Sequence, residues 1–373
     1  MPWPFTKKTN HYALVGNHQG GLLAVKGISP TGAASATPLG WSDRPPVEAK
    51  SIHQLMASAG NPKGNVAISL PLDQFEVLTL TINKVPREVI AKILPYHINK
   101  VIEAPLADYI YDWQVSKELK DSLQLNVFLF PAQIFQEMRS TLNHYRLTPV
   151  ALEPDVFSAC AFLESRRRLS HNGASLIVLL WPASVSIAIY DHKDITLTRD
   201  VHLKRPAQED DNSVAPEEQR TEEEINGPMM PAADKPPPQD DSLFGPNSDD
   251  LLANFLVATK EERDDSATAL SAPAEEAPHP TASMPGPQLS NQNWAAYINQ
   301  VSLELMRTRD YFNAVIKGNQ IKTAFIGGGE AAWQPLAAEL AASLDITVQD
   351  IMENEQASFG NNLFEAISTG VLS

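Results

Sequence analysis

A run of three glycines near the end of the chain is the pattern best suited to chemistry. A predicted apolar strand ends at Gly327-Gly328-Gly329, and a helix is predicted over 331–344. Glycine has no Cβ atom, so a flat ring or a phosphate group can approach its backbone closely, and a following helix start favours anions. The pattern indicates either a nucleotide platform or a tight strand-to-helix turn that the fold itself requires.

Other signatures of catalytic or metal sites are absent from the sequence. The nine histidines and the single cysteine show no His-x-x-x-His or Cys-x-x-Cys spacing, so no metal site is predicted. Neither Gly-x-x-x-x-Gly-Lys-Ser/Thr nor Gly-x-Ser-x-Gly occurs. Cys160 lies among apolar residues of the predicted helix 155–166, which favours a buried structural thiol over a nucleophile.

The negative charge of the chain is concentrated in one segment. Residues 206–290 hold 19 acidic and 4 basic residues, a net charge of −15 out of −16 for the whole chain. This proline-rich composition predicts a disordered insertion over 206–288. Within it, a short helix would place four apolar residues on one face, as a transient helix or a docking motif: Leu251, Leu252, Phe255 and Leu256. The remainder is nearly neutral, so no nucleic-acid partner is expected.

The sequence also predicts no membrane-spanning helix. The longest apolar stretch, 174–190, contains Pro182 and falls short of the ~20 residues that a spanning helix needs, so two buried strands are expected. The first eight residues lack the apolar run of a signal peptide. We expect a cytoplasmic protein that reaches a membrane through partners.

Strands and helices alternate along the rest of the chain, which predicts a two-lobed α/β protein. The first part contains a predicted hairpin over 11–25, strands near 65–70, 75–82, 109–115, 123–130 and 147–152, and helices over 46–59, 86–101, 131–144 and 155–166. The second part contains strands within 174–189, at 195–201, before the glycines and near 346–348, and helices over 294–315 and 363–371.

The order of these elements resembles the PilM branch of the actin-like proteins, which form a collar under type IV pilus machines and hold the tail of the membrane protein PilN. The motifs that carry the resemblance are VAISLP at 66–71, IEAPL at 102–106, YDW at 111–113, LTPVALEPDVF at 147–157 and ITLTRDV at 195–201. Degenerate MshI and HofM-like variants are more similar to the chain than an intact PilM is.

The resemblance implies a two-lobed actin-like (ribonuclease H-like) fold. The first lobe would span 1–165, with an inserted α/β subdomain at about 72–145. The second lobe would span 166–205 and 289–373, interrupted by the disordered acidic insertion 206–288.

Both phosphate loops depart from the pattern of the family. Gly16 stands where the first loop has an aspartate, and Leu180 and Pro182 replace the acid and the glycine of the second. Without these carboxylates, phosphoryl transfer loses its main electrostatic support. The resemblance therefore implies a pseudo-ATPase without catalytic residues and a vestigial nucleotide site: Gly20, Gly21, Ser184, Gly327, Gly328 and Gly329. No cofactor is expected, with ATP as the alternative.

A non-catalytic adaptor at the cytoplasmic face of a pilus or secretion machine is the preferred interpretation. A groove between the first lobe and the unit 75–130 would take a PilN-like tail, and a homo-oligomer or ring is possible. The surviving acids Glu153 and Asp155 are expected to be structural, with Asp155 capping its helix. The alternatives are an actin-like ATPase of the same machine and a split form of the GspL-type secretion protein, which normally continues into a spanning helix.

Overall fold

The computed structural model describes residues 10–28, 34–170, 173–204, 289–328, 330–352 and 362–373. The predicted insertion 206–288, its apolar motif at 251–256 and Gly329 lie outside the described residues. No helix among the described residues is long and apolar enough to cross a membrane.

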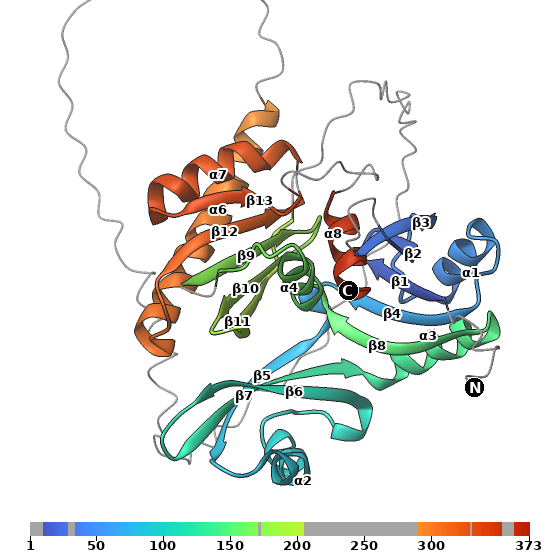
Figure 1. Ribbon diagram of the computed structural model, residues 1–373, viewed down its shortest axis with the longest axis horizontal. Helices are drawn as coiled ribbons and strands as arrows, with labels where there is room; N and C mark the ends of the chain where they lie inside the picture. Colours follow the sequence, from blue (N-terminus) through green and yellow to red (C-terminus); the bar gives the residue numbers. More distant parts are fainter. Residues whose placement is uncertain (1–9, 29–33, 171–172, 205–288, 329, 353–361) are drawn as a thin grey trace, which may run out of the picture. The chain divides into compact units, whose positions relative to one another are not determined.

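Two five-stranded sheets form the framework (Figure 1). The first has the order β3-β2-β1-β4-β8, with β1 (His11–Gly16), β2 (Gly21–Ile28), β3 (Ala34–Ser42), β4 (Gly64–Leu70) and β8 (Leu147–Pro154). The second has the order β11-β10-β9-β12-β13, with β9 (Ala174–Leu180), β10 (Val185–Asp191), β11 (Asp194–Val201), β12 (Ile321–Gly327) and β13 (Thr347–Asp350).

The two sheets repeat one topology. In each, three antiparallel strands are followed by two strands that pair in parallel. In the first sheet the parallel pairs are β1 with β4 and β4 with β8. In the second sheet they are β9 with β12 and β12 with β13. The strand β9 is buried along its whole length, as expected for a central strand covered on both faces. The predicted α/β architecture is confirmed.

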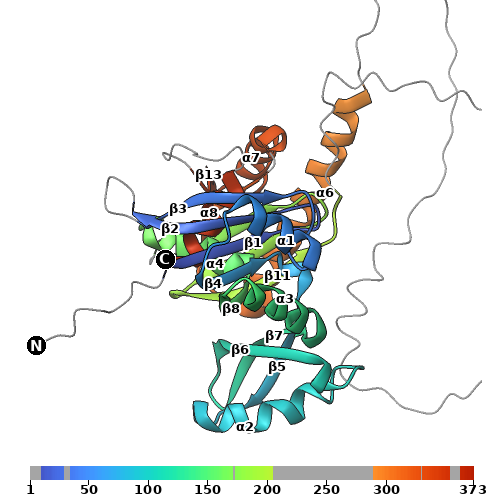
Figure 2. The same cartoon turned by 90° about the vertical axis from the view of Figure 1, so that its right-hand side faces the viewer.

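A smaller sheet is inserted between β4 and β8 of the first sheet. It has the order β5-β7-β6, with β5 (Glu76–Asn83), β6 (Tyr109–Glu118) and β7 (Ser122–Pro131). Figure 2 shows α2 (Arg87–Ile98) on one face of this sheet. Its buried residues Ile90, Leu94 and Ile98 share an apolar cluster with the strands, so this unit has a core of its own.

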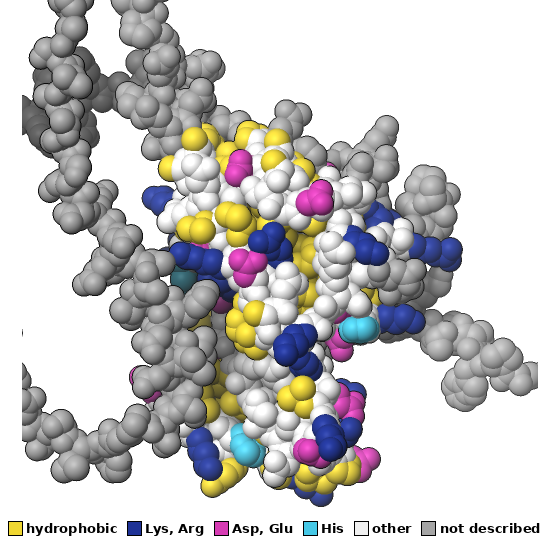
Figure 3. All heavy atoms as spheres, turned by 90° about the vertical axis from the view of Figure 1, so that its left-hand side faces the viewer, with side chains coloured by type: hydrophobic (Ala, Val, Ile, Leu, Met, Phe, Trp, Pro, Cys, Tyr) yellow, Lys and Arg dark blue, Asp and Glu magenta, His cyan; other side chains and the backbone are white. Residues whose placement is uncertain are grey.

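The remaining helices cover the two larger sheets. Helices α1 (Ala49–Ser58) and α3 (Ala132–His144) contact the first sheet. Helices α6 (Leu289–Tyr311) and α7 (Glu330–Leu344) belong to the second half, and a π-turn (Phe312–Ile316) extends α6. On the face shown in Figure 3, basic and acidic side chains are interspersed among hydrophobic ones over the described residues.

Two helices lie between the larger sheets and join their cores. Helix α4 (Asp155–Ser165) and the last helix, α8 (Asn362–Val371), pack against each other, and one apolar cluster includes residues of both sheets and both helices. The sequence assigned α8 to the second lobe, whereas the structure places it against β1, β3, β4 and α4. Its apolar residues Leu363, Phe364 and Ile367 are buried there.

Candidate functional site

The first predicted phosphate loop is the turn between β1 and β2. The side chain of Asn17 folds over this turn, and its Oδ1 accepts the backbone N–H groups of Gln19 at 2.7 Å and Gly20 at 2.9 Å. The turn is closed further by the Asn17 N–H, which donates to the Gly20 carbonyl at 2.9 Å. Three amides of this turn that could face a phosphate are therefore already bonded within it.

Pro46 fills the space beside Gly16, the residue that stands where the family has the aspartate of its first phosphate loop. A Cβ atom on Gly16 would lie 2.1 Å from Cγ of Pro46, and one on Gly21 would lie 3.1 Å from Cβ of the same proline. A Cβ atom on Gly20 would lie 2.8 Å from the Ser42 carbonyl oxygen. These three glycines thus serve close packing of the turn against the segment that follows β3.

The second predicted phosphate loop is the turn between β9 and β10. The Trp181 N–H donates to the Ser184 carbonyl at 2.9 Å, which closes the turn, and both side chains are buried. The hydroxyl of Ser184 has no hydrogen-bond partner within the described part of the chain. Ser186 lies in β10.

A buried carboxylate, Asp155, links this turn to α4. Its Oδ2 accepts the indole N–H of Trp181 and the hydroxyl of Ser186 at 2.7 Å, and its Oδ1 accepts the Val156 N–H at 2.8 Å. Burial is the main cause that raises the pKa of Asp155 from 3.8 to about 7. The residue that caps the helix is Pro154, which makes no side-chain hydrogen bond, so Asp155 is not the cap that the sequence predicted. Its carboxylate mainly bonds Trp181 and Ser186 instead.

The described glycines of the triplet pack against apolar side chains. A Cβ atom on Gly327 would lie 2.9 Å from Cδ1 of Leu363 and 3.0 Å from Cγ2 of Ile351. Gly328 has a φ of +83°, and its Cβ would lie 2.6 Å from the Leu180 carbonyl oxygen. The turn therefore needs glycine at 328 for its backbone and at both positions for space.

An aromatic series extends from β3 through α8 to the second turn. The ring of Phe364 meets Trp41 edge-on at a centroid distance of 5.2 Å and Trp181 at 5.4 Å. Among the predicted site residues, Gly328 lies next to Leu180, which precedes the second turn. Gly20 lies next to Ser42, and Gly21 lies next to Pro46. The vestigial nucleotide site as a whole stays a prediction.

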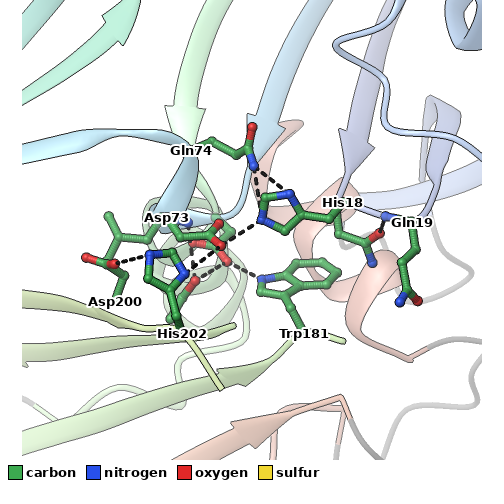
Figure 4. Close-up of polar contacts among 11 residues, drawn as sticks. His18, Gln19, Asp73, Gln74, Trp181, Asp200 and His202 are labelled. Atoms are coloured by element: carbon green, nitrogen blue, oxygen red, sulfur yellow. Dashed lines mark hydrogen bonds and ion pairs between the residues drawn. The ribbon is translucent and has the colours of Figure 1, made fainter. Parts of the chain in front are cut away.

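A polar cluster follows the first turn (Figure 4). His18 Nε2 lies 2.7 Å from Oδ2 of the buried Asp73, and Gln74 Nε2 lies 2.9 Å from His18 Nδ1. His202 Nδ1 lies 3.8 Å from the same Asp73 oxygen, and its Nε2 lies 3.8 Å from Asp200 Oδ2. Among the residues that the structure describes, no group of three or more ligating side chains could hold a metal ion.

A groove of about 560 Å³ lies between the inserted sheet and the first sheet, in the region that the sequence placed only roughly. Its walls come from the inserted sheet, from β8 and from the start of α4. The lining residues are Phe75, residues 110–114, Phe128, Phe130, Phe135, residues 149–154 and Phe157.

Two strand edges form the long sides of this groove. Strands β6 and β8 each stand last in the order of their sheets, so each has one side without a neighbouring strand among the described residues. Consecutive residues of both strands line the groove, as expected where an edge is presented, because one face of a strand would contribute alternate residues only. The side chain of Val150 in β8 is 57% exposed.

The inserted sheet is fastened to the second sheet beside this groove. Gln114 Nε2 donates to the Ile195 carbonyl at 2.7 Å, and Lys117 Nζ donates to the carbonyl oxygens of Val315, at 3.3 Å, and Ile316. Strand β6 therefore touches the groove with its first half and the second lobe with its second half.

The sequence matches no known family profile and no curated protein. Its structure is similar to a chain of the PilM–PilN type IV pilus biogenesis complex, with a TM-score of 0.60 and 13% identity over 97% of this chain and 96% of that chain. The chain therefore has the same fold as that chain, which is the actin-like fold that the sequence predicted.

Two weaker similarities have TM-scores below 0.5. A Bacteroides thetaiotaomicron protein with an actin-like ATPase fold and unknown function has a TM-score of 0.46 and 9% identity, over 93% of each chain. The cytoplasmic domain of EpsL, an inner membrane component of the type II secretion system of Vibrio cholerae, has a TM-score of 0.36 and 10% identity, over 52% of this chain and 71% of that domain.

Proposed function

We propose that the protein is a non-catalytic adaptor of a type IV pilus machine, of the MshI or HofM-like kind, working at the cytoplasmic face of the inner membrane. Its groove would hold the short cytoplasmic tail of a PilN-like membrane protein. The observation that carries the proposal is the groove between the two strand edges of β6 and β8.

The mode of binding follows from the chemistry of these edges. An extended peptide can add as a strand to an exposed sheet edge, with main-chain hydrogen bonds for affinity and side-chain pockets for selection. The aromatic floor, which includes Phe75, Phe128 and Phe157, offers apolar pockets of this kind. The similarity to a chain of the PilM–PilN type IV pilus biogenesis complex supports the same partner class.

The ATPase alternative gains no support from the two phosphate turns. Asn17 occupies amides of the first turn, Pro46 fills the space beside Gly16, and the buried Trp181 occupies the second turn. An isothermal titration that gives a saturable heat with Mg·ATP would restore that alternative.

The proposal is tested with the purified protein and a labelled peptide of the cytoplasmic tail of a PilN-like single-span membrane protein from the same organism. Binding at low micromolar Kd is expected, and Val150→Arg should weaken it at least tenfold. Leu303→Arg is the matched control, because Leu303 is an apolar side chain of α6 that is 42% exposed and does not line the groove. Absence of binding at tens of micromolar, or equal loss in both variants, would refute the adaptor proposal.

A further inference from the structure

We infer that the segment held by this groove is a basic one: an extended apolar stretch that carries an arginine or lysine opposite Glu153 and Asp112. This inference rests on the proposed function and specifies the chemistry of the partner. It does not depend on which machine the adaptor serves.

The charged groups of the groove have one sign. Among its lining residues the ionisable acids are Asp112 and Glu153, and no lysine or arginine lines it. Among the ion pairs found within the described part of the chain, such as Arg199 with Glu304 and Lys84 with Glu118, none involves either carboxylate. A bound cation would therefore meet two acids and no competing base.

Glu153 is the better placed of the two. Its Oε1 accepts the hydroxyl of Ser158 at 2.6 Å, and that hydroxyl lies 2.8 Å from Ser69 Oγ. When an ionised carboxylate is largely removed from water, a single hydrogen bond from a neutral hydroxyl does not replace its hydration. Burial accordingly raises the pKa of Glu153. An incoming guanidinium would supply two charge-assisted donors and stabilise the ionised form.

The carboxylate of Asp112 belongs to the wall of the groove that β6 forms. Its Oδ1 accepts the Trp113 N–H at 2.8 Å, so this carboxylate covers a main-chain donor of the β6 edge. This donor belongs to a strand that stands last in the order of its sheet. A strand that adds to β6 would replace the carboxylate at this amide and leave Asp112 free to pair with a cation of the same strand.

The expected partner chemistry agrees with membrane topology. Short segments on the cytoplasmic side of a spanning helix carry an excess of lysine and arginine. A groove with apolar walls and two acids favours such a tail over one with an acidic residue, because like charges across an interface repel each other.

The experiment uses the full chain and three fluorescein-labelled decapeptides that alternate valine and serine around a central arginine, citrulline or glutamate. Anisotropy titrations should give the arginine peptide a Kd at least tenfold below that of citrulline, with no measurable binding of the glutamate peptide. In Glu153→Gln, which keeps an acceptor for Ser158, the advantage of arginine over citrulline should fall below threefold. Glu103→Gln is the control, because Glu103 is exposed and lies outside the groove.

The outcomes separate the two proposals. Equal affinity for arginine and citrulline, or an unchanged preference in Glu153→Gln with an unchanged melting temperature, would overturn the basic partner and leave the adaptor intact. If none of the three peptides binds, the groove is not a site for extended segments, and both proposals fall.

Discussion

The stability of the protein should depend on pH through one buried carboxylate. Asp155 is 0% exposed and holds the indole of Trp181 and the hydroxyl of Ser186, so it ties α4 to the second sheet. Its pKa is raised from 3.8 to about 7, mainly because burial penalises the charged form. Between pH 3.8 and about pH 7, the native state therefore keeps a proton on Asp155 that the unfolded chain has released.

The direction and the size follow from linkage. Where the native state binds more protons than the unfolded state, the free energy of unfolding falls as pH rises. The contribution of Asp155 is fully present below the unfolded pKa and is lost as pH rises through about 7. The native and unfolded pKa values of Asp155 differ by roughly three units, and about two of these units lie between pH 5 and pH 8. At about 1.4 kcal/mol per pKa unit, the free energy of unfolding falls by about 3 kcal/mol over that range.

Urea unfolding of the wild-type protein and of Asp155→Asn at pH 5 and pH 8 measures this term. The difference in unfolding free energy between the two proteins should change by about 3 kcal/mol across the range, with the wild type relatively more stable at pH 5. Glu103→Gln, at an exposed site, should leave the pH dependence of the wild type unchanged. A parallel pair of pH profiles for wild type and Asp155→Asn would refute the reasoning.

Three further predictions concern packing. Gly370→Ala should destabilise the fold by about 3 kcal/mol or more in urea unfolding, since its Cβ would lie 1.8 Å from the Ser158 carbonyl oxygen and force α8 away from α4; an unchanged midpoint would contradict this packing. Gly16→Asp should lower the melting temperature without restoring a heat of Mg·ATP binding, and adding Pro46→Ala should recover much of the loss; a failure of the second change to help would show that the proline is not the obstacle. Phe364→Ala should cost about 3–5 kcal/mol in urea unfolding and shift tryptophan emission to the red, and an unshifted spectrum would argue against the aromatic series.

Periodicity and turn residues predicted most of the elements, because local patterns agree with the fold at nearly every step. The exception is β3, which was not predicted. Pro38 and Gly40 interrupt its apolar pattern, and both are tolerated because β3 is an edge strand with a bulge opposite Leu23 and Ala24.

The candidate sites were predictable only in outline. The general position of the groove followed from the resemblance, but its residues come from strands far apart in sequence, and their register cannot be read from either strand alone. The bond between Asp155 and Trp181 joins residues 26 positions apart in different elements, and no local pattern marks it. The filling of the first turn by Pro46 was equally hidden, because it depends on the path of the segment after β3.

The position of α8 has a consequence for synthesis of the chain. The apolar surfaces of β1 and α4 emerge from the ribosome well before the helix that covers them. Until residues 362–371 have been translated, the amino-terminal half presents that surface to water and to chaperones. Ribosome-bound nascent chains that stop short of α8 should accordingly recruit holdases, and chains in which α8 has emerged should lose that association.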